Sequence, residues 1–339
     1  MKAATPRVAV VFNPPQLASD HPDAVSEADV VDVADAVRQA LRSRGFVSEC
    51  LSAAPPVSAF VVKMMGWKPN LVFNLAEGFN GVSAGATHLT SLFELLALPY
   101  TGSPVEALAA CVSKSRAKAL LRGFGLPTTD SIVIEPQQKL PRIAMPNAYL
   151  VKPDAEDGSL GIDQNSVVND SKELAERVQF LREHYHGAVI VEPYLPGSEF
   201  NIGIIALPEP QALAVAQIVF RPEIGRWPIL TYEAKWDEGS IADLASLPLC
   251  PAPIDEKLAG RLSALAVAAF RATGCRDYAR VDMRLDAEGR PMILEVNPNP
   301  DIGPNAGWAR AARVSGYTYE DAIGLIAEEA LRRGSSRNV

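Results

Sequence analysis

Cysteine and histidine are scarce in this chain, with four residues of each among 339 positions. The cysteines, Cys50, Cys111, Cys250 and Cys275, lie far apart in the sequence, and none of them forms a C-x-x-C pair. This spacing indicates small buried residues in a reducing compartment rather than a redox motif or a disulfide framework. We therefore expect a cytoplasmic protein.

The sequence also lacks concentrated positive charge and long apolar runs. Its formal net charge is −8, and no segment combines clustered Lys and Arg with aromatic residues. Binding to nucleic acid is therefore not expected, because a nucleic-acid surface requires a positive patch. No apolar run reaches the length of a membrane span, and the apolar core of the N-terminal sequence is too short for a signal peptide. We expect no membrane partner.

Two common nucleotide-binding motifs are missing, the Walker A sequence and a strand–G-x-G-x-x-G–helix unit. The sequence "GVSAG" at 81–85 does match G-x-S-x-G. A nucleophile elbow needs its serine on a sharp turn directly between strand and helix, and here "AEGFN" separates the strand from the motif. The last histidine, His186, also leaves no obvious partner late in the chain. A loop is the simpler interpretation, and a serine hydrolase using Ser83 is the alternative.

The first hundred residues alternate short apolar segments with helical patterns. Residues 7–13 and 70–75 predict buried strands, and residues 26–45 and 86–99 predict helices. This alternation favours a parallel α/β layer. The turn-rich sequence "YTGSP" then marks a boundary, so we predict an N-terminal domain over residues 1–103.

Strands dominate the rest of the chain after two helical segments in residues 104–127. The turns between these strands contain Pro or Gly, which indicates an antiparallel sheet. Further helices are predicted over residues 254–275 and 318–334. We predict a central domain over residues 104–190 and a C-terminal domain over residues 191–339.

The sequence "RVDMRLDAEGRPMILEVNPNP", residues 280–300, predicts a β-hairpin with one polar and one apolar face. Side chains alternate along a strand, so Arg280 and Asp282 share a face, as do Glu295 and Asn297 on the second strand. The opposite, apolar face then holds Val281, Met283, Leu285, Met292, Leu294 and Val296. Oxygen-bearing side chains grouped in this way suit Mg²⁺, which one or two carboxylates and substrate phosphates usually hold. A solvated hairpin with incidental ion pairs is the alternative.

Three other stretches carry groups that suit a nucleotide. In "YLVKPDAEDGSLGI" a strand delivers Lys152, and the loop after it exposes backbone N–H groups around Ser159 that can bind phosphate oxygens. In "VIVEPYLPGSEFNIG" the first strand suits one wall of an adenine pocket, and Glu199 on the next strand suits ribose hydroxyls. Lys235 in "YEAKW" offers another phosphate contact. The ordinary alternatives are a Gly-Ser turn, an exposed Glu and a solvated lysine.

Taken together and in this order, these stretches resemble the ATP-grasp enzymes, specifically the D-alanine–D-alanine ligase branch. The resemblance extends over nearly the whole chain, from "VFNLAEG" through "SKSRAKALLRGFGLPT" and "VKPDAEDGSLGI" to the hairpin. It implies an α/β plus α+β fold with an N-terminal parallel α/β domain, a central lid domain and a C-terminal antiparallel-sheet catalytic domain. ATP would lie between the last two domains. The resemblance also implies two Mg²⁺ ions, with Mn²⁺ as a possible substitute, and a homodimer.

The same resemblance implies roles for individual residues. Asp282, Glu295 and Asn297 would hold the metal, and Arg280 would stabilise the oxyanion of a tetrahedral intermediate. The implied nucleotide contacts are Lys114, Lys152, Ser159, the adenine hinge Glu192, Pro193, Tyr194 and Leu195, the ribose carboxylate Glu199, and Lys235.

The positions expected to bind the organic substrates depart from the family pattern. The glycine-rich N-terminal signature is absent, and Glu27 matches its acidic residue only loosely. Glu77 stands where these ligases usually carry His, Gly158 replaces a serine, and Trp236 replaces a tyrosine. Asp301 takes the place of a glycine close to the second substrate's carboxylate, where an acid would repel it. A cationic nucleophile suits Asp301 better.

These observations predict an ATP-dependent carboxylate–amine ligase that joins an amino acid or similar acid to an amine through an acyl phosphate. A D-alanine–D-alanine ligase is the alternative within the class. A non-catalytic nucleotide-binding protein is a further alternative, which the set Lys152, Asp282, Glu295 and Asn297 argues against.

Overall fold

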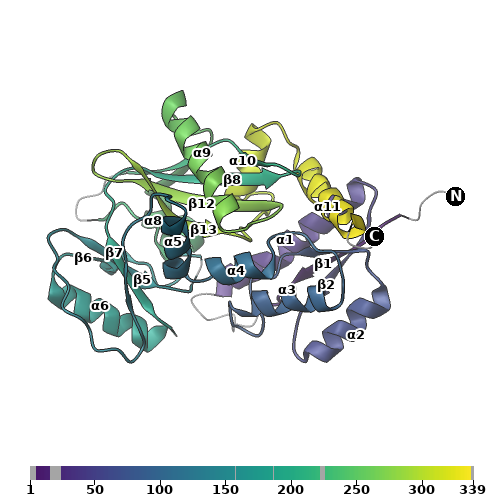
Figure 1. Cartoon of the computed structure of the whole chain (residues 1–339), viewed down its shortest axis with the longest axis horizontal. Helices are drawn as coiled ribbons and strands as arrows, with labels where there is room; N and C mark the ends of the chain where they lie inside the picture. Colours follow the sequence, from purple (N-terminus) through teal and green to yellow (C-terminus); the bar gives the residue numbers. More distant parts are fainter. Residues whose placement is uncertain (1–4, 16–23, 157, 186, 222–225, 337–339) are drawn as a thin grey trace.

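The structure, a computed structural model, describes residues 5–15, 24–156, 158–185, 187–221 and 226–336. Three β-sheets organise these residues. Figure 1 shows the N-terminal sheet and the central sheet at opposite ends of the molecule, with the larger C-terminal sheet between them. Among the described residues, no helix is both long enough and apolar enough to cross a membrane.

The N-terminal domain contains a parallel sheet with helices packed on it, as predicted. Its strands pair in the order β2-β1-β3. The elements are β1 (Arg7–Phe12), α1 (Ala24–Ser43), β2 (Val47–Ser52), α2 (Val57–Trp67), β3 (Leu71–Asn74) and α3 (Gly85–Leu95). The two predicted strands are buried, as expected for a covered parallel sheet. The sequence pattern did not indicate β2, because this edge strand is partly exposed and carries mixed polar residues.

A four-stranded antiparallel sheet with one long helix forms the central domain. The strands pair in the order β4-β7-β5-β6. The elements are β4 (Ile132–Ile134), β5 (Tyr149–Pro153), the short 3₁₀ helix η1 (Gln164–Ser166), β6 (Val167–Val168), α6 (Ser171–His184) and β7 (Val189–Pro193). Strand β7 spans the predicted boundary at residue 190 and pairs with β5 along its whole length. We therefore propose that the central domain continues to Pro193.

Two short helices precede the central sheet but pack against the C-terminal one. They are α4 (Val105–Cys111) and α5 (Lys114–Gly123). Ala107, Cys111 and Leu121 belong to the same apolar core as the C-terminal strands. Helix α5 therefore presents its lysines at the joint between the central and C-terminal domains.

The C-terminal sheet is antiparallel, with the order β11-β10-β8-β12-β13 and β9 paired to β8. Its elements are β8 (Glu199–Ala206), β9 (Pro210–Ala212), β10 (Ala216–Phe220), α7 (Tyr232–Trp236), α8 (Ile241–Leu244), β11 (Ser246–Leu249), α9 (Glu256–Ala272), β12 (Tyr278–Leu285) and β13 (Pro291–Asn297). Alternate residues such as Ile202, Ile204, Val281 and Met283 pack with helix α9. The other residues of the same strands point to the opposite face, which the functional site occupies.

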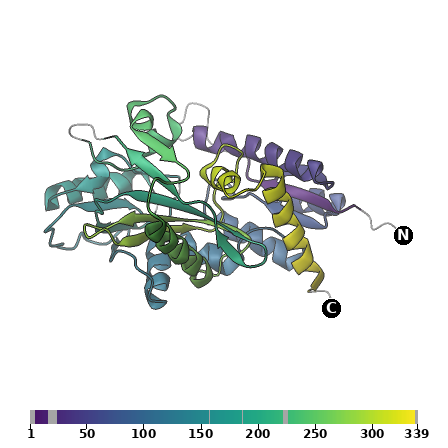
Figure 2. The same ribbon diagram turned by 90° about the horizontal axis from the view of Figure 1, so that it is seen from above.

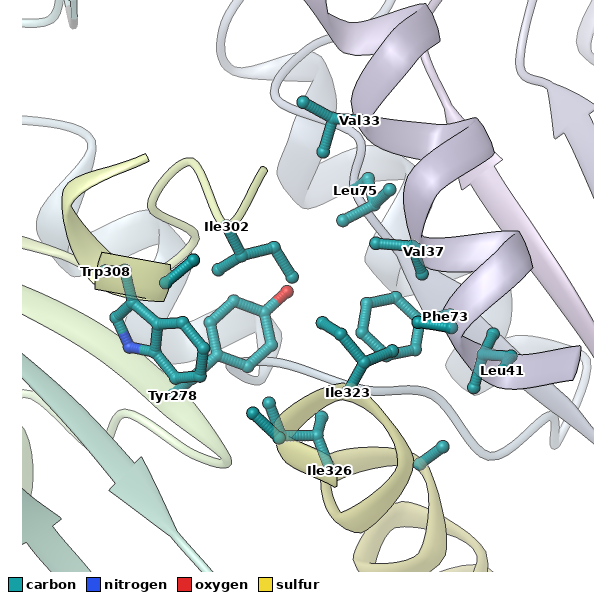
Figure 3. Packing of buried hydrophobic residues seen from close by; sticks show 14 of the residues in the cluster. Val33, Val37, Leu41, Phe73, Leu75, Tyr278, Ile302, Trp308, Ile323 and Ile326 are labelled. Atoms are coloured by element: carbon teal, nitrogen blue, oxygen red, sulfur yellow. The ribbon is translucent and has the colours of Figure 1, made fainter. Parts of the chain in front are cut away.

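The last two helices join the C-terminal domain to the N-terminal one. Helix α10 (Gly307–Val314) and helix α11 (Tyr319–Ser336) follow the hairpin. Figure 3 shows Tyr278 and Trp308 packed beside Ile302, with Ile323 of α11 facing Val37 of α1 and Ile326 near Tyr278. Figure 2 shows α11 running beside the N-terminal domain, where it packs against α1. Because the core is shared, the N-terminal domain is held in place beside the C-terminal sheet.

Asp277 ties three segments together at this shared boundary. Its carboxylate accepts hydrogen bonds from Arg333 of α11, at 2.5 and 3.0 Å, and from the backbone N–H of Gly102, at 2.9 Å. The side chain is almost completely buried. Replacing it with an amide would remove the charge that pairs with Arg333 and leave only one oxygen acceptor for the two donors.

We expect Asp277→Asn to lower the free energy of unfolding by about 2–4 kcal/mol, the range for breaking a buried ion pair whose arginine stays partly solvated. Urea unfolding measures the change. Asp130→Asn is the matched control, because its side chain is 97% exposed, and we expect it to change stability by less than about 0.5 kcal/mol. Equal effects of the two variants would contradict the role of Asp277.

Candidate active site

A cavity of about 420 Å³ lies between the central sheet and the open face of the C-terminal sheet. Its floor is formed by alternate residues of adjacent strands, which the register places side by side: Glu295 faces Asp282, Asp282 faces Asn201, and Asn201 faces Ala216. The predicted residues that line it are Lys152, Gly158, Ser159, Glu192, Pro193, Tyr194, Leu195, Glu199, Lys235, Trp236, Arg280, Asp282, Glu295 and Asp301. Most of the predicted nucleotide site is therefore one continuous surface.

The hairpin pairs as predicted, with one local correction. Arg280 lies opposite Asn297, and Asp282 lies opposite Glu295. A β-bulge after Asp282 inserts one extra residue, Leu294, into the second strand. The predicted alternation beyond this point was therefore wrong: Leu294 lines the cavity, and Ile293 lies in the apolar core. Period-two alternation cannot anticipate a bulge.

Asp282 is the centre of a hydrogen-bonded group on the floor. Arg280 donates to both of its carboxylate oxygens at 2.8 Å. Asn201 donates to Oδ1 at 2.7 Å, and Asn297 donates to Oδ2 at 3.1 Å. Sequence reasoning missed Asn201, although its position two residues after Glu199 on one strand placed it on the same face.

Glu295 is an ionised carboxylate beside this group. Burial by itself would raise its pKa, but the positive charges of Lys114, Lys152 and Arg280 outweigh burial and lower the pKa to about 2. The Lys114 Nζ lies 3.8 Å from Glu295 Oε2, although Lys114 is carried by helix α5. The helix thus brings one predicted nucleotide lysine to the predicted metal carboxylate.

The oxygen donors of this floor fit a hard divalent cation. Asp282 and Glu295 offer carboxylate oxygens and Asn297 offers an amide oxygen, which are ligand types that Mg²⁺ accepts. Within the described residues, no three His, Cys, Asp or Glu side chains are grouped to hold a metal by themselves. A cation here would therefore need further oxygens from phosphate or water, as is usual for Mg²⁺ at nucleotide sites.

A buried ion cluster forms part of the cavity wall. Glu192 of β7 forms ion pairs with two lysines: its Oε2 is 2.8 Å from the Lys118 Nζ, and its Oε1 is 2.8 Å from the Lys152 Nζ. Thr129 donates to Glu192 Oε2 at 2.6 Å, and Lys118 donates to Thr128 and Thr129. Sequence reasoning missed Lys118, although it lies one helical turn after Lys114.

Glu192 and Lys152 hold each other in the ionised state, whereas burial opposes the charge of Lys118. Burial opposes ionisation of Glu192, but Lys118 and Lys152 lower its pKa. Burial also opposes the charge on Lys152, yet Glu192 and Glu295 raise its pKa. Burial dominates at Lys118, whose pKa is lowered despite the attraction of Glu192. The predicted hinge glutamate therefore uses its side chain to orient Lys152.

Arg284 was also missed, although it continues the alternation of Arg280 and Asp282 along β12. It lies 3.3 Å from Glu199 Oε2, donates to the hydroxyl of Tyr194 at 3.3 Å, and donates to the carbonyl oxygen of Gly197 at 3.0 Å. Burial raises the pKa of Glu199, and Arg284 opposes this effect. The arginine thus connects the predicted ribose carboxylate to the predicted adenine hinge.

The loop after β5 faces the cavity in a left-handed conformation that favours glycine. Gly158, Ser159 and Gly161 all have positive φ, at 66°, 65° and 69°. A Cβ on Gly161 would lie 2.8 Å from Pro153. The carbonyl oxygen of Gly158 accepts a hydrogen bond of 2.9 Å from the indole of Trp236. Gly158 and Trp236, both predicted substrate positions, therefore contact each other directly.

A smaller pocket adjoins the main cavity through Trp236 and Asp301, which line both. The N-terminal domain contributes Asp29 and the predicted Glu77 to it. Partial burial and the nearby charge of Asp301 raise the pKa of Asp29. The side chain of Glu27 lies outside the described part of the structure. Three carboxylates thus surround this end of the site, and sequence reasoning missed Asp29.

Lys235 projects into the main cavity between these groups. The surrounding protein displaces water and lowers the pKa of its ammonium group, and the charge of Arg280 has the same effect. Glu77 and Asp282 oppose the shift. Lys235 therefore lies within electrostatic reach of both the predicted metal group and the acidic pocket.

A parallel α/β domain, an antiparallel lid and an antiparallel sheet with cations and carboxylates facing the lid define the ATP-grasp class of enzymes. The family model described as "D-ala D-ala ligase C-terminus" matches residues 120–328. The chain therefore belongs to the D-alanine–D-alanine ligase family of ATP-grasp ligases, and the fold predicted from the resemblance is confirmed.

Individual relatives agree with this assignment. The uncharacterized protein y4sG of Sinorhizobium fredii is 35% identical over 266 residues, covering 78% of this chain and 75% of that protein. A D-alanine–D-alanine ligase of Parvibaculum lavamentivorans is 30% identical over 298 residues, with coverage of 86% and 89%. In fold, the chain is similar to a Bacillus anthracis D-alanine–D-alanine ligase complexed with ATP, with a TM-score of 0.78, 19% identity and coverage of 98% and 100%.

The alternative nucleophile has no catalytic partner in the described structure. Ser83 precedes helix α3, after the loop that follows β3. Among the described residues, Ser83 forms no hydrogen bond with a histidine. The ring of His184 contacts the backbone oxygen of Phe180. The G-x-S-x-G match is therefore better explained as the loop predicted for it.

We expect Glu192→Gln to lower the free energy of unfolding at pH 7 by about 3–5 kcal/mol, because two buried lysines lose their counter-charge. The lowered pKa of Glu192 means that its stabilisation is complete above its unfolded pKa of about 4.3 and is lost as the pH falls below that value. The stability difference between the wild type and Glu192→Gln should therefore shrink between about pH 5 and pH 3. Urea unfolding across this pH range measures it.

The double variant Lys118→Met, Glu192→Gln is the matched control. It removes one charge of each sign, so it should be more stable than Glu192→Gln alone. A stability difference that stays constant with pH, or a double variant no better than the single one, would contradict the account of this cluster.

Proposed function

We propose that the chain is a carboxylate–amine ligase that forms an amide bond at the expense of ATP through an acyl phosphate. One observation carries this proposal: the charges of Lys152 and Arg280, which line the cavity between the lid and the catalytic sheet, and of Lys114, 3.8 Å from Glu295 behind it, all act on the ionised Glu295. This arrangement suits a triphosphate, whose negative charges need cations above and a metal-binding floor below. A Bacillus anthracis D-alanine–D-alanine ligase of the same fold forms a complex with ATP, which supports ATP as the nucleotide.

In the proposed reaction, the substrate carboxylate attacks the γ-phosphorus of ATP, and ADP leaves. The amine then attacks the acyl carbon, loses a proton, and expels phosphate. Lys152 and Lys114 would neutralise phosphate oxygens, and Arg280 would hold the oxyanion that forms on the acyl carbon. The Gly158–Ser159 loop would exclude water, which would otherwise hydrolyse the acyl phosphate.

Asp282, Glu295 and Asn297 would hold Mg²⁺, and we infer two ions, which Mn²⁺ could replace. When bound, the metal would supply charge neutralisation to the phosphates. Arg280 now pairs with Asp282 and would exchange part of that contact for the substrate oxyanion. Glu199, Tyr194 and Leu195 would bind the nucleoside.

For the organic substrates, we infer a pair other than two D-alanines. Glu77, Asp29 and Asp301 make one end of the site acidic, and this charge favours an ammonium or other cation and repels a carboxylate. Gly158 and Trp236 form a contact between the lid and this end. A D-alanine–D-alanine ligase is the second candidate, favoured by relatives of that name such as the one from Parvibaculum lavamentivorans. The homodimer and the cytoplasmic location remain predictions.

We expect Mg²⁺ and ATP to give ADP only when a suitable acid and amine are present, and Asp282→Asn to reduce this release by about a hundredfold or more. The assay uses pools of amino acids and amines, with D-alanine alone as a separate arm and mass spectrometry of the products. Glu288→Gln, in the exposed turn of the same hairpin, should match the wild type. A D-alanine dipeptide would establish the second candidate, and nucleotide binding without turnover in any pool would contradict the ligase.

We expect Asp301→Asn to raise KM for a cationic amine about tenfold, because one charged hydrogen bond becomes neutral. An asparagine oxygen can still accept from the backbone N–H of Gly303, now 2.7 Å from Asp301 Oδ1, so the loop should be preserved. KM for ATP should not change. Steady-state kinetics with the amine identified above test this expectation, and an unchanged KM for that amine would contradict the assigned role of Asp301.

A further inference from the structure

The main cavity continues sideways from the catalytic floor into a second lobe. Gly203 of β8 lies opposite Arg280, and the floor then passes to Ala216 of β10 and to Cys250, the residue after β11. The residues of the cavity floor become less polar along this direction, from Asp282 through Asn201 to Ala216. We call the part of the cavity bounded by Ala216, Pro248, Cys250, Gly307, Arg310 and Ala311 the side lobe.

Helix α10 forms the roof of the side lobe. Gly307, Arg310 and Ala311 are spaced at i, i+3 and i+4, so they share one face, and all three line the cavity. The helix is held on the sheet by Trp308, which is buried and donates to the carbonyl oxygen of Ile204 at 3.0 Å. A Cβ added to Gly307 would meet nothing within 4 Å. Exposed Gly307 thus leaves the mouth of the lobe open at the start of a firmly packed helix.

Arg310 is the cation of the side lobe. Its Nη2 donates to the backbone oxygen of Asn305 at 3.2 Å. In the part of the chain that the structure describes, no carboxylate forms an ion pair with it. The guanidinium is close enough to Cys250 to oppose, by its charge, the rise that burial causes in the pKa of the thiol. Within the described residues, four of the five N–H groups of Arg310 thus have no protein acceptor, and they can bind an anion.

We propose that the side lobe binds the side chain of one organic substrate, that this side chain is an apolar stem ending in an anion, and that Arg310 recognises the anion. This inference rests on the proposed ligase function and names a substrate class for the same site. Ala216, Cys250 and Ala311 contact the stem, and Arg310 determines specificity for the charge.

The distances across the sheet set the size of the substrate. Neighbouring strands lie about 4.8 Å apart, so Ala216 and Cys250 lie about 10 and 14 Å from the strand that carries Arg280. A methyl group on a reacting amino acid cannot reach that far. Arg310 lines the lobe from the opposite side, and we infer a substrate stem of about two to four carbon atoms, longer than a methyl group.

The thiol of Cys250 provides a direct test of occupancy. Wild-type protein with Mg²⁺ and a non-hydrolysable ATP analogue is treated with N-ethylmaleimide, and modification of each cysteine is followed by peptide mass spectrometry. The probes are both enantiomers of 2-aminoadipate and of norleucine, which match in side-chain carbon number but differ in the terminal carboxylate. Cys50, which lies in the N-terminal domain, is the internal control.

We expect 2-aminoadipate to protect Cys250 at about one tenth of the concentration that norleucine requires, because only the acid forms a charged pair with Arg310. Arg310→Gln should abolish this difference, whereas Arg313→Gln on the same helix should retain it. Gly307→Leu fills the lobe and should abolish protection by either probe. Labelling of Cys50 should not change in any arm.

Equal protection by norleucine and 2-aminoadipate would overturn the role of Arg310, and no protection by either would overturn the side lobe as a substrate site. The measurement needs no turnover. Protection of Cys250 without ADP release in any pool would therefore contradict the proposed ligase function. ADP release without protection of Cys250 would contradict only the side lobe as a substrate site.

Discussion

A carboxylate buried between two ammonium groups underlies the geometry of the nucleotide site. Glu192 lies 2.8 Å from both Lys118 and Lys152, and these residues come from β7, α5 and β5. Each charge would be costly to bury alone, so the three segments must approach one another closely for any of them to be buried. Helix α5 packs on the C-terminal sheet, whereas β5 and β7 belong to the lid. The ion cluster therefore fixes how the lid meets the catalytic sheet.

The catalytic floor follows from that joint and from the pleat of the sheet. Alternate residues of β8 and β12 form the core with α9, so the residues between them must face the cavity. Lys114, carried by α5, then reaches Glu295 across the joint and helps to keep that carboxylate ionised. The same packing that stabilises the fold brings cationic and anionic side chains to one surface. There the cations can pair with the phosphates of a bound triphosphate.

The two ends of the site differ in charge, and this difference is the basis for the substrates that we propose. The N-terminal domain contributes Asp29 and Glu77 to an acidic pocket, whereas α10 carries Arg310 over the side lobe. Both features lie outside the predicted nucleotide residues. One scaffold can serve different substrates when the walls around the substrate differ and the rest of the site is kept.

The sequence by itself indicated the order of the domains and the polar face of the hairpin, because these depend on motif order and on local alternation. The nucleotide residues that the family resemblance implies stay a prediction. The sequence did not indicate Lys118, Arg284 or Asn201 as members of the site, since each acquires its role from a partner on another segment. Nor could it place Leu294 in the cavity, because a bulge interrupts the alternation without a local signal. Only the tertiary structure decided which charges face one another, because charge pairing acts through space and brings together residues that are remote in sequence.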